Sequence, residues 1–235
     1  LANATAYAQP ALLACLYCAC ACLLLWLGAQ LRQAMNLHRV AATLATFILA
    51  GALANALAGV IQFHGRPDAL EELVAQLHGD RIYGNIAQPN LYANYLALGM
   101  ASLLLLWKIR ALRTHFAGPA LILLAYASAL TLSRSTLLYP AGLAALTLLI
   151  SSHAKQPTDR RLEWGAGAGA IIVLAVQLSA SWIHASAGLP PQEEDAIHRV
   201  LASGGSDPRL EIWGTALKVF ASAPIAGVGM GYFPG

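Results

Sequence analysis

Charge is scarce in this sequence of 235 residues, since only 11% of them are Asp, Glu, Lys or Arg while 58% are hydrophobic. A soluble domain carries roughly 25% charged residues, so the shortage argues against a water-soluble globular fold. The apolar residues are also gathered into blocks long enough to cross a hydrocarbon core ~30 Å thick. We therefore expect an all-α fold, a polytopic transmembrane helical bundle with about six spans and two extracytoplasmic loop segments.

Metal-binding and redox patterns are lacking as well. All four cysteines fall inside one apolar block, and the seven histidines include no His-Glu-x-x-His spacing. We interpret the cysteines as small residues of the membrane core, with a metal or redox site as the less favoured alternative. The sequence thus predicts neither a metal nor a cofactor. These cysteines are Cys15, Cys18, Cys20 and Cys22.

The predicted spans divide the chain into a membrane region and an outer region. Residues 1–183 form the transmembrane region, with an outer loop at 64–90 that contains a predicted short helix at 67–77. Residues 184–235 begin a large outer segment with an amphipathic helix at 209–221, which we expect at the membrane surface. Because the chain starts without methionine, we expect a fragment of a longer protein. The six spans are 11–28, 40–63, 91–107, 118–132, 136–150 and 165–183.

The distribution of charge predicts an orientation. Segments after the first, third and fifth spans carry eight basic and two acidic residues, whereas the remaining segments carry six basic and nine acidic residues. The positive-inside rule places the first set in the cytoplasm. Short basic loops of this kind are better explained by topology than by a nucleic-acid partner, so we predict membrane lipids as partners and no nucleic acid.

Arg134 is the strongest single candidate for a functional residue. Only Ser133, Arg134 and Ser135 separate the fourth and fifth spans, which predicts a tight helical hairpin or a re-entrant pair. An arginine at a helix centre in the membrane costs about 2.5–3.5 kcal/mol unless a partner or ligand compensates it. Its guanidinium suits a phosphate group, and the neighbouring hydroxyls of Ser133, Ser135 and Thr136 add donors. We favour an anion site here over an arginine that only extends toward lipid headgroups.

A second candidate lies at the outer mouth of the third span. Gln88, Asn90 and Asn94 place amides where the chain enters the membrane, and amides can orient sugar hydroxyls. Alternatively, Asn85 forms a turn and Asn90 satisfies backbone donors without any ligand. Residue chemistry alone leaves both interpretations open.

A third candidate is Arg209, which begins the outer helix near Glu211 and Trp213. A helix N-terminus and a cation both attract an anion. On residues alone, a simple ion pair of Arg209 with Asp207 or Glu211 is slightly favoured. The outer histidines can in principle act as general bases, although single loop histidines are usually only solvated. They are His64, His78, His184 and His198.

Three motifs occur in a fixed order along the chain. They are Tyr83-Gly-Asn-Ile-Ala-Gln-Pro-Asn90, Leu130-Thr-Leu-Ser-Arg134, and Arg209-x-x-x-Trp213 followed by a glycine-rich turn. Together they resemble the bacterial O-antigen ligase/polymerase superfamily. The nearest resemblance is to its protein O-oligosaccharyltransferases of the PglL or pilin-glycosylation type, in which the Gly-Asn-x-x-Gln-Pro-Asn stretch is characteristic.

This resemblance implies a multi-pass enzyme of the bacterial inner membrane whose active site faces the periplasm. Such enzymes transfer a preassembled oligosaccharide from undecaprenyl pyrophosphate to a Ser or Thr hydroxyl of a pilin or another periplasmic protein. By motif position, Arg134 and Arg209 would be the catalytic residues that bind the pyrophosphate. The family histidine in a His-Asn motif has no match in this sequence. Substrate-binding residues would be Arg81, Asn85, Gln88, Asn90, Ser133 and Ser135.

Other functions remain open at this point. Within the superfamily, the alternatives are an O-antigen ligase, whose acceptor is the lipid A core, and an O-antigen polymerase. From a different class, a transporter or flippase of a lipid-linked anionic substrate would place Arg134 along a pathway. The unusual polar residues gather at the outer mouth rather than near mid-membrane, which favours an enzyme. A purely structural scaffold would leave Arg134 unexplained.

Overall fold

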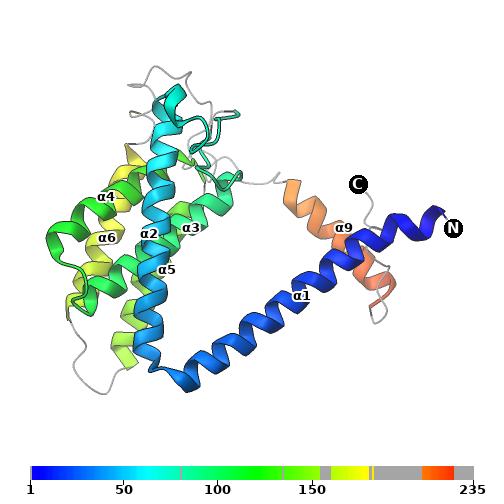
Figure 1. Cartoon of the computed structure of the whole chain (residues 1–235), viewed down its shortest axis with the longest axis horizontal. Helices are drawn as coiled ribbons and strands as arrows, with labels where there is room; N and C mark the ends of the chain where they lie inside the picture. Colours follow the sequence, from blue (N-terminus) through cyan, green and yellow to red (C-terminus); the bar gives the residue numbers. More distant parts are fainter. Residues whose placement is uncertain are drawn as a thin grey trace. The chain divides into compact units, whose positions relative to one another are not determined.

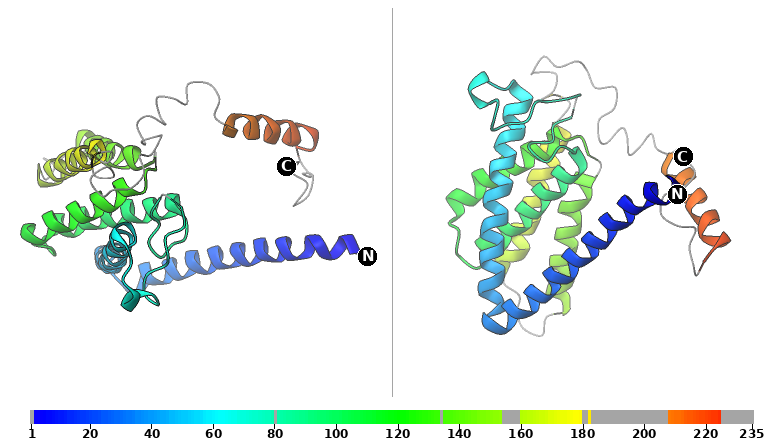
Figure 2. Two further views of the ribbon diagram at one scale, coloured as in Figure 1. Left: turned by 90° about the horizontal axis from the view of Figure 1, so that it is seen from above. Right: turned by 45° about the vertical axis from the view of Figure 1, so that its right-hand side comes forward.

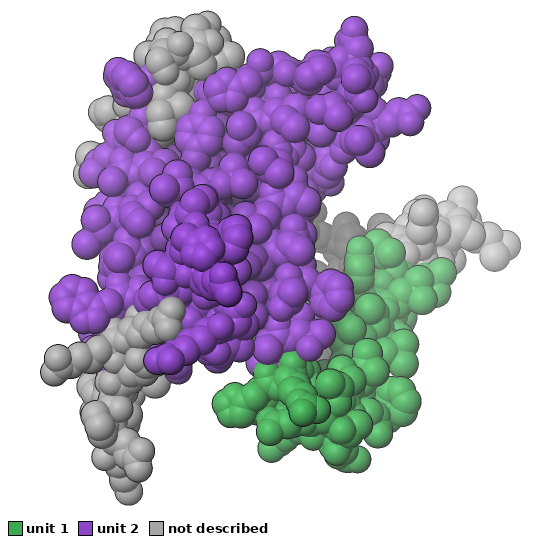
Figure 3. Space-filling view, turned by 60° about the vertical axis from the view of Figure 1, so that its left-hand side comes forward, with its two compact units in different colours: residues 1–40, 202–235 green, residues 41–201 purple. Residues whose placement is uncertain are grey.

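A computed structural model of the chain describes residues 2–79, 81–133, 135–153, 160–179, 182 and 208–224. Within these residues all regular structure is helical, as the sequence predicted. The chain divides into two compact units, which Figure 3 shows in different colours. Unit 1 comprises Leu1–Val40 and Ala202–Gly235, and unit 2 comprises Ala41–Leu201.

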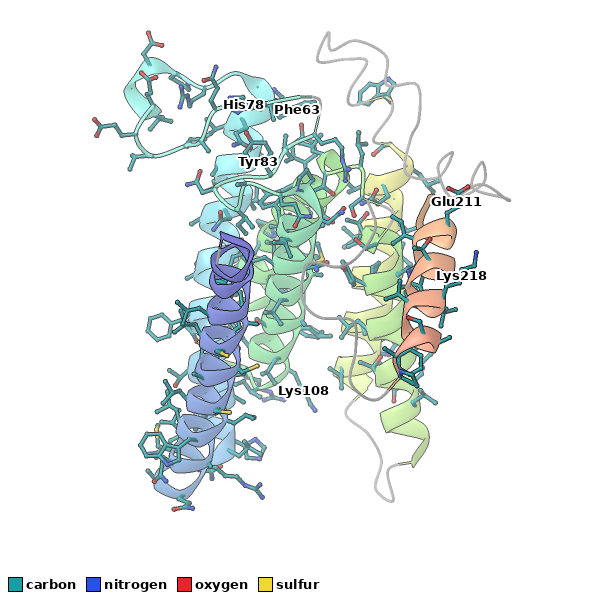
Figure 4. All side chains as sticks on the ribbon, turned by 90° about the vertical axis from the view of Figure 1, so that its right-hand side faces the viewer. Phe63, His78, Tyr83, Lys108, Glu211 and Lys218 are labelled. Carbon is teal, nitrogen blue, oxygen red and sulfur yellow. The ribbon has the colours of Figure 1, made fainter. Side chains whose placement is uncertain are left out.

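The described part of unit 1 includes the helices α1 (Ala2–Ala34) and α9 (Pro208–Ser222). All four cysteines are exposed on the surface of α1. α9 covers residues 209–221, where the sequence predicts an amphipathic helix. Its large apolar side chains, including Trp213 and Phe220, are exposed, while Glu211 and Lys218 also project from it (Figure 4). Its location at the membrane surface stays a prediction.

Three helices are long and apolar enough to cross a membrane among the residues that the structure describes. They contain the stretches Leu12–Ala34, Leu37–His64 and Pro89–Lys108. The apolar helices Thr114–Leu130, Leu138–Leu149 and Leu162–Leu178 are shorter. The helical membrane architecture expected from composition is thereby confirmed. That the three shorter helices also cross the membrane remains a prediction.

Unit 2 is a group of helices that run side by side in Figures 1 and 2. Both α3 and α6 pack against α4 and α5, and α3 also packs against α6. The turn between α4 and α5 therefore joins two helices that share the same neighbours. The helices are α2 (Leu37–His64), α3 (Pro89–Lys108), α4 (Thr114–Leu130), α5 (Ser135–His153) and α6 (Arg160–Leu178).

Glycines allow α2 to approach α3 closely. A Cβ atom added to Gly59 would overlap the hydroxyl of Tyr92, and one added to Gly99 would overlap the Cβ of Ala52. Tyr92 is fully buried, and its hydroxyl donates to the backbone carbonyl of Asn55 at 2.9 Å. Small residues at a membrane helix interface permit close backbone contact in this way. The contact at Tyr92 fixes the N-terminal part of α3 relative to α2.

The predicted helix at 67–77 is wrong. Only a short 3-10 helix forms, η1 (Asp68–Leu70), which is followed by a turn. Arg66 explains why the helix does not continue, because its guanidinium donates to the carbonyls of Glu71 at 3.0 Å and Val74 at 2.8 Å. Those carbonyls are thus occupied by a side chain from outside the segment rather than by backbone N–H groups further along a helix.

Candidate functional site

A buried glutamine fixes the loop 65–88 at the C-terminal end of α2. Gln62 is 3% exposed, and its Nε2 donates to the carbonyls of Ala75 at 2.8 Å and Gly84 at 2.7 Å. Its Oε1 accepts from the backbone N–H groups of Tyr83 at 3.3 Å and Gly84 at 2.9 Å. Every donor and acceptor position of this amide therefore has a backbone partner. Sequence analysis missed Gln62, although a glutamine within the apolar span 40–63 was a usable signal.

Unit 2 has two chemically different ends. His78 and Tyr83 of the loop lie with Phe63 at one end, and Lys108 lies at the other end of α3 (Figure 4). The Nδ1 of His78 is 3.0 Å from the Tyr83 hydroxyl. His64 follows Phe63 in the chain, and its Nε2 is 3.1 Å from the hydroxyl of Tyr126. The loop end therefore carries the polar side chains that the sequence assigned to the outer face, while His184 and His198 lie outside the described residues.

The polar atoms of Asn85 bind the backbone of the same loop. Its Oδ1 accepts from the Ala75 N–H at 3.0 Å, and its Nδ2 donates to the Leu73 carbonyl at 2.7 Å. The Asn85 backbone N–H in turn donates to the Oδ1 of Asn55 at 3.3 Å. In this arrangement Asn85 shapes the loop, and a direct contact with substrate stays a prediction.

Four of the predicted site residues meet in one hydrogen-bonded group, the Asn90 cluster, formed by Arg81, Asn90, Ser133 and Ser135. The Oδ1 of Asn90 accepts from Ser133 Oγ at 3.0 Å and from the Arg81 guanidinium at 3.3 Å. The Oγ atoms of Ser133 and Ser135 are 2.7 Å apart. Arg81 also donates through Nε to the carbonyl of Thr131 at 2.8 Å. Two separate segments of the chain are thus joined at the loop end of unit 2.

Backbone strain lies on both sides of the Asn90 cluster. Ala87 has φ 62° and Leu132 has φ 51°, a left-handed region that side chains other than glycine rarely adopt. Leu132 is 1% exposed, so the surrounding core holds it in place. Strain of this kind persists only where neighbouring structure imposes it, and it concentrates at functional sites. Gln88, which follows Ala87 in the chain, is exposed at the N-terminus of α3 and makes no capping bond through its side chain.

Both predicted catalytic arginines fall at the limits of the described structure. Arg134 lies outside the described residues, and the side chain of Arg209, on α9 of unit 1, does so too. The residues that flank Arg134 in sequence are well connected. Thr136 donates to the carbonyl of Ser133 at 2.6 Å, and the N–H of Ser133 donates to the hydroxyl of Thr131 at 3.2 Å.

An apolar cavity of about 450 Å³ lies between α3, α4, α5 and α6. At its polar end the Tyr139 hydroxyl donates to the Oδ1 of Asn94. Asn94 follows Asn90 by one turn of α3, and Tyr139 follows Ser135 by one turn of α5. The cavity therefore begins one helical turn from the Asn90 cluster. Small and apolar residues that line it include Ala97, Ala101, Leu138, Gly142, Ala166 and Gly169.

Comparison with known proteins places this arrangement in a family. A family profile described as O-antigen ligase matches residues 119–235, and one described as protein glycosylation ligase matches residues 82–107. The two matched ranges include Asn90, Ser133 and Ser135 of the Asn90 cluster, and Arg81 directly precedes the second range. Over these residues the chain resembles the O-antigen ligase superfamily. The suspected resemblance to this superfamily is thereby confirmed.

A curated relative supports the same assignment. The general O-oligosaccharyltransferase of Acinetobacter baylyi is 28% identical over 192 residues, which are 80% of this chain. The matched part is 33% of that protein, so the chain spans about one third of the length of this relative. No solved structure matches the chain.

Proposed function

We propose that this chain is part of a membrane O-oligosaccharyltransferase. The enzyme transfers a preassembled oligosaccharide from undecaprenyl pyrophosphate to a Ser or Thr hydroxyl of a periplasmic or pilin-like protein. The match of residues 119–235 to the profile described as O-antigen ligase supports transfer of a glycan at a membrane. The relative named general O-oligosaccharyltransferase supports transfer of an oligosaccharide, and the profile described as protein glycosylation ligase supports a protein acceptor.

The observation that carries the proposal is the position of the Asn90 cluster one turn from an apolar cavity. A lipid-linked glycan has a charged pyrophosphate and sugar hydroxyls at one end and a long hydrocarbon chain at the other. Amide, hydroxyl and guanidinium groups suit the polar part. A cavity lined mainly by alanine, glycine and leucine suits the hydrocarbon part.

In the proposed reaction the acceptor hydroxyl oxygen attacks the anomeric carbon of the glycan. A new glycosidic bond forms as the bond to the pyrophosphate oxygen breaks, and the hydroxyl proton passes to a base. Arg134 and Arg209 neutralise the negative charge that accumulates on the departing pyrophosphate. A metal is not required for this step, since the lipid pyrophosphate is already a good leaving group.

We also propose that all six apolar helices of the membrane region cross the bacterial inner membrane. The Asn90 cluster then faces the periplasm and Lys108 faces the cytoplasm. The excess of basic residues in the segments after the first, third and fifth spans supports this orientation. The separation of Lys108 from the loop end of unit 2 agrees with it (Figure 4).

The test uses the full-length protein in cells that supply a lipid-linked glycan and a pilin acceptor. Wild type is compared with Arg134→Ala and Arg209→Ala, and the mass of the acceptor is measured. Each variant is expected to lose transfer at least about a hundredfold, as expected when a group that stabilises transition-state charge is removed. Arg113→Ala, at the opposite end of α4, is the matched control and should keep wild-type transfer. Unchanged transfer in both active-site variants contradicts the assignment of the pyrophosphate contacts.

Two alternative functions are distinguished by the same cells. The family profile described as O-antigen ligase favours a lipid A core acceptor, and in that case glycan appears on lipid A and the pilin mass does not change. A transporter or flippase would instead change the side of the membrane on which the lipid-linked glycan is found, without joining it to either acceptor.

A further inference from the structure

A second buried glutamine faces the turn between α4 and α5 from α6. Gln177 is 5% exposed and lies in the last turn of α6. Its Nε2 donates to the hydroxyl of Thr136 at 2.7 Å. Thr136 is 1% exposed, and its hydroxyl donates to the carbonyl of Ser133 at 2.6 Å. These two bonds connect α6 to the residues on both sides of Arg134.

The direction of the chain of hydrogen bonds determines how the Gln177 amide is oriented. Because the Thr136 proton goes to the Ser133 carbonyl, the hydroxyl oxygen is left to accept, and only the NH₂ group of Gln177 can supply that bond. The carbonyl oxygen of Gln177 then points elsewhere. It is buried and has no hydrogen-bond partner among the described residues.

A buried acceptor without a partner lowers stability, so an apolar residue of similar size would be preferred if α6 only had to pack. Gln62 provides a contrast within the same unit, since it is equally buried and all of its amide positions are satisfied. Gln177 also lies one turn beyond Val173, which lines the apolar cavity. The open acceptor is therefore located between the cavity and the turn that carries Arg134.

We propose that Gln177 is a positioning residue that holds the turn between α4 and α5 through Thr136, with its free carbonyl oxygen open to a hydroxyl or N–H donor brought by the bound substrate complex. This inference rests on the proposed function, because the turn carries the arginine assigned to the pyrophosphate. Gln177 acts on the reaction through the 133–136 turn. It does not touch the reacting atoms.

The kinetic test compares glycan transfer by the full-length protein in vesicles at several concentrations of lipid-linked donor. Gln177→Leu and Thr136→Val are each expected to lower kcat about tenfold, the effect of losing one positioning hydrogen bond. Thr136→Ser keeps the hydroxyl and should restore most of the rate. The double variant should be no slower than either single variant, because both act on one chain of bonds.

Thr147→Val is the matched control. Thr147 is another buried threonine of α5, 5% exposed, and its hydroxyl donates only within its own helix, to the Ala144 carbonyl at 2.7 Å. It should transfer glycan at the wild-type rate. Equal losses in Thr147→Val and Thr136→Val, or a wild-type rate in Thr136→Val, would overturn the proposal.

A readout that is independent of activity separates this inference from the proposed function. Ser135→Cys is introduced after the four native cysteines of α1 are replaced by alanine, and its labelling by a water-soluble maleimide is timed with and without Gln177→Leu. Faster labelling, by about fivefold or more, is expected when the turn is released. If wild type transfers no glycan and labelling still accelerates, the proposed function fails and the positioning role stands. An unchanged labelling rate in the Gln177→Leu variant contradicts the positioning role of Gln177.

Discussion

The side chain of Gln62 forms a two-way bridge to the backbone of Gly84, accepting from its N–H at 2.9 Å and donating to its carbonyl at 2.7 Å. The pairing resembles that between two residues of adjacent strands, but one partner is an amide side chain at the end of a membrane helix. It connects α2 to the loop that carries Arg81 toward the Asn90 cluster.

Gln62→Leu is therefore expected to release the loop. Four backbone groups lose their partner, and the three that belong to Tyr83 and Gly84 are buried. At roughly 1–3 kcal/mol for each unsatisfied buried group, with partial relaxation, we expect a loss of about 2–4 kcal/mol in the free energy of unfolding. Thermal unfolding in detergent and the rate of proteolysis within residues 65–88 measure the change. The control is Gln76→Leu, the same substitution at an exposed glutamine of the same loop. Similar proteolysis rates in the two variants would contradict the bridging role of Gln62.

Gly84 itself tolerates no side chain. It has φ 55°, and an added Cβ would lie 2.7 Å from the Tyr92 ring and 3.1 Å from the Asn55 carbonyl. Gly84→Ala should lower the melting temperature in detergent more than Gly79→Ala. Gly79 has φ 88° but open space around the added atom, so that variant isolates the cost of the backbone conformation, about 1 kcal/mol. Equal shifts in melting temperature would show that packing against Tyr92 adds nothing.

Arg81→Lys tests the connection between the loop and the Asn90 cluster. One guanidinium reaches both the Thr131 carbonyl and the Asn90 Oδ1, and a lysine ammonium cannot reproduce this planar, two-sided geometry. We expect glycan transfer at low donor concentration to fall about tenfold, the effect of ~1.4 kcal/mol. Arg66→Lys, in the same loop but bound to the Glu71 and Val74 carbonyls, should leave the KM for the donor unchanged. A wild-type KM in Arg81→Lys would exclude a contribution of the cluster to donor binding.

Gly142→Leu tests the cavity. Gly142 lines it, and nothing lies within 4 Å of an added Cβ, so a larger side chain enters without a backbone clash. If the cavity takes the hydrocarbon part of the donor, KM should rise by about fivefold or more, because filling the space removes favourable apolar contact. Thermal stability should change little.

Gly118→Leu is the control for the cavity. It is also a helical glycine with nothing within 4 Å of an added Cβ, but it lies on α4 and does not line the cavity. Donor KM should match wild type in this variant. A similar rise in both variants would mean that membrane insertion, rather than the cavity, had been altered.

The Asn90 cluster shows which parts of the candidate site can be predicted from sequence motifs. Arg81, Asn90, Ser133 and Ser135 were each selected from sequence, and the start of α3 at Pro89 follows directly from the preference of proline for the first position of a helix. Their mutual contacts were not predictable, because Asn90 and Ser133 lie 43 residues apart. The hydrogen bond between them depends on how α3 packs against the end of α4, which no local pattern encodes.

The sequence by itself determined that lipid rather than water surrounds the apolar segments and that these segments are helices. Blocks of apolar residues require membrane helices, because every backbone polar group must be satisfied within its own segment in lipid. The shape of the loop 65–88 was decided only by the tertiary structure. The predicted helix at 67–77 gave way because Arg66 and Asn85 bind its backbone groups from outside. Gln62 and Gln177 look alike in sequence, yet one is fully satisfied and the other keeps an open acceptor, since hydrogen-bond partners are set by neighbours in space.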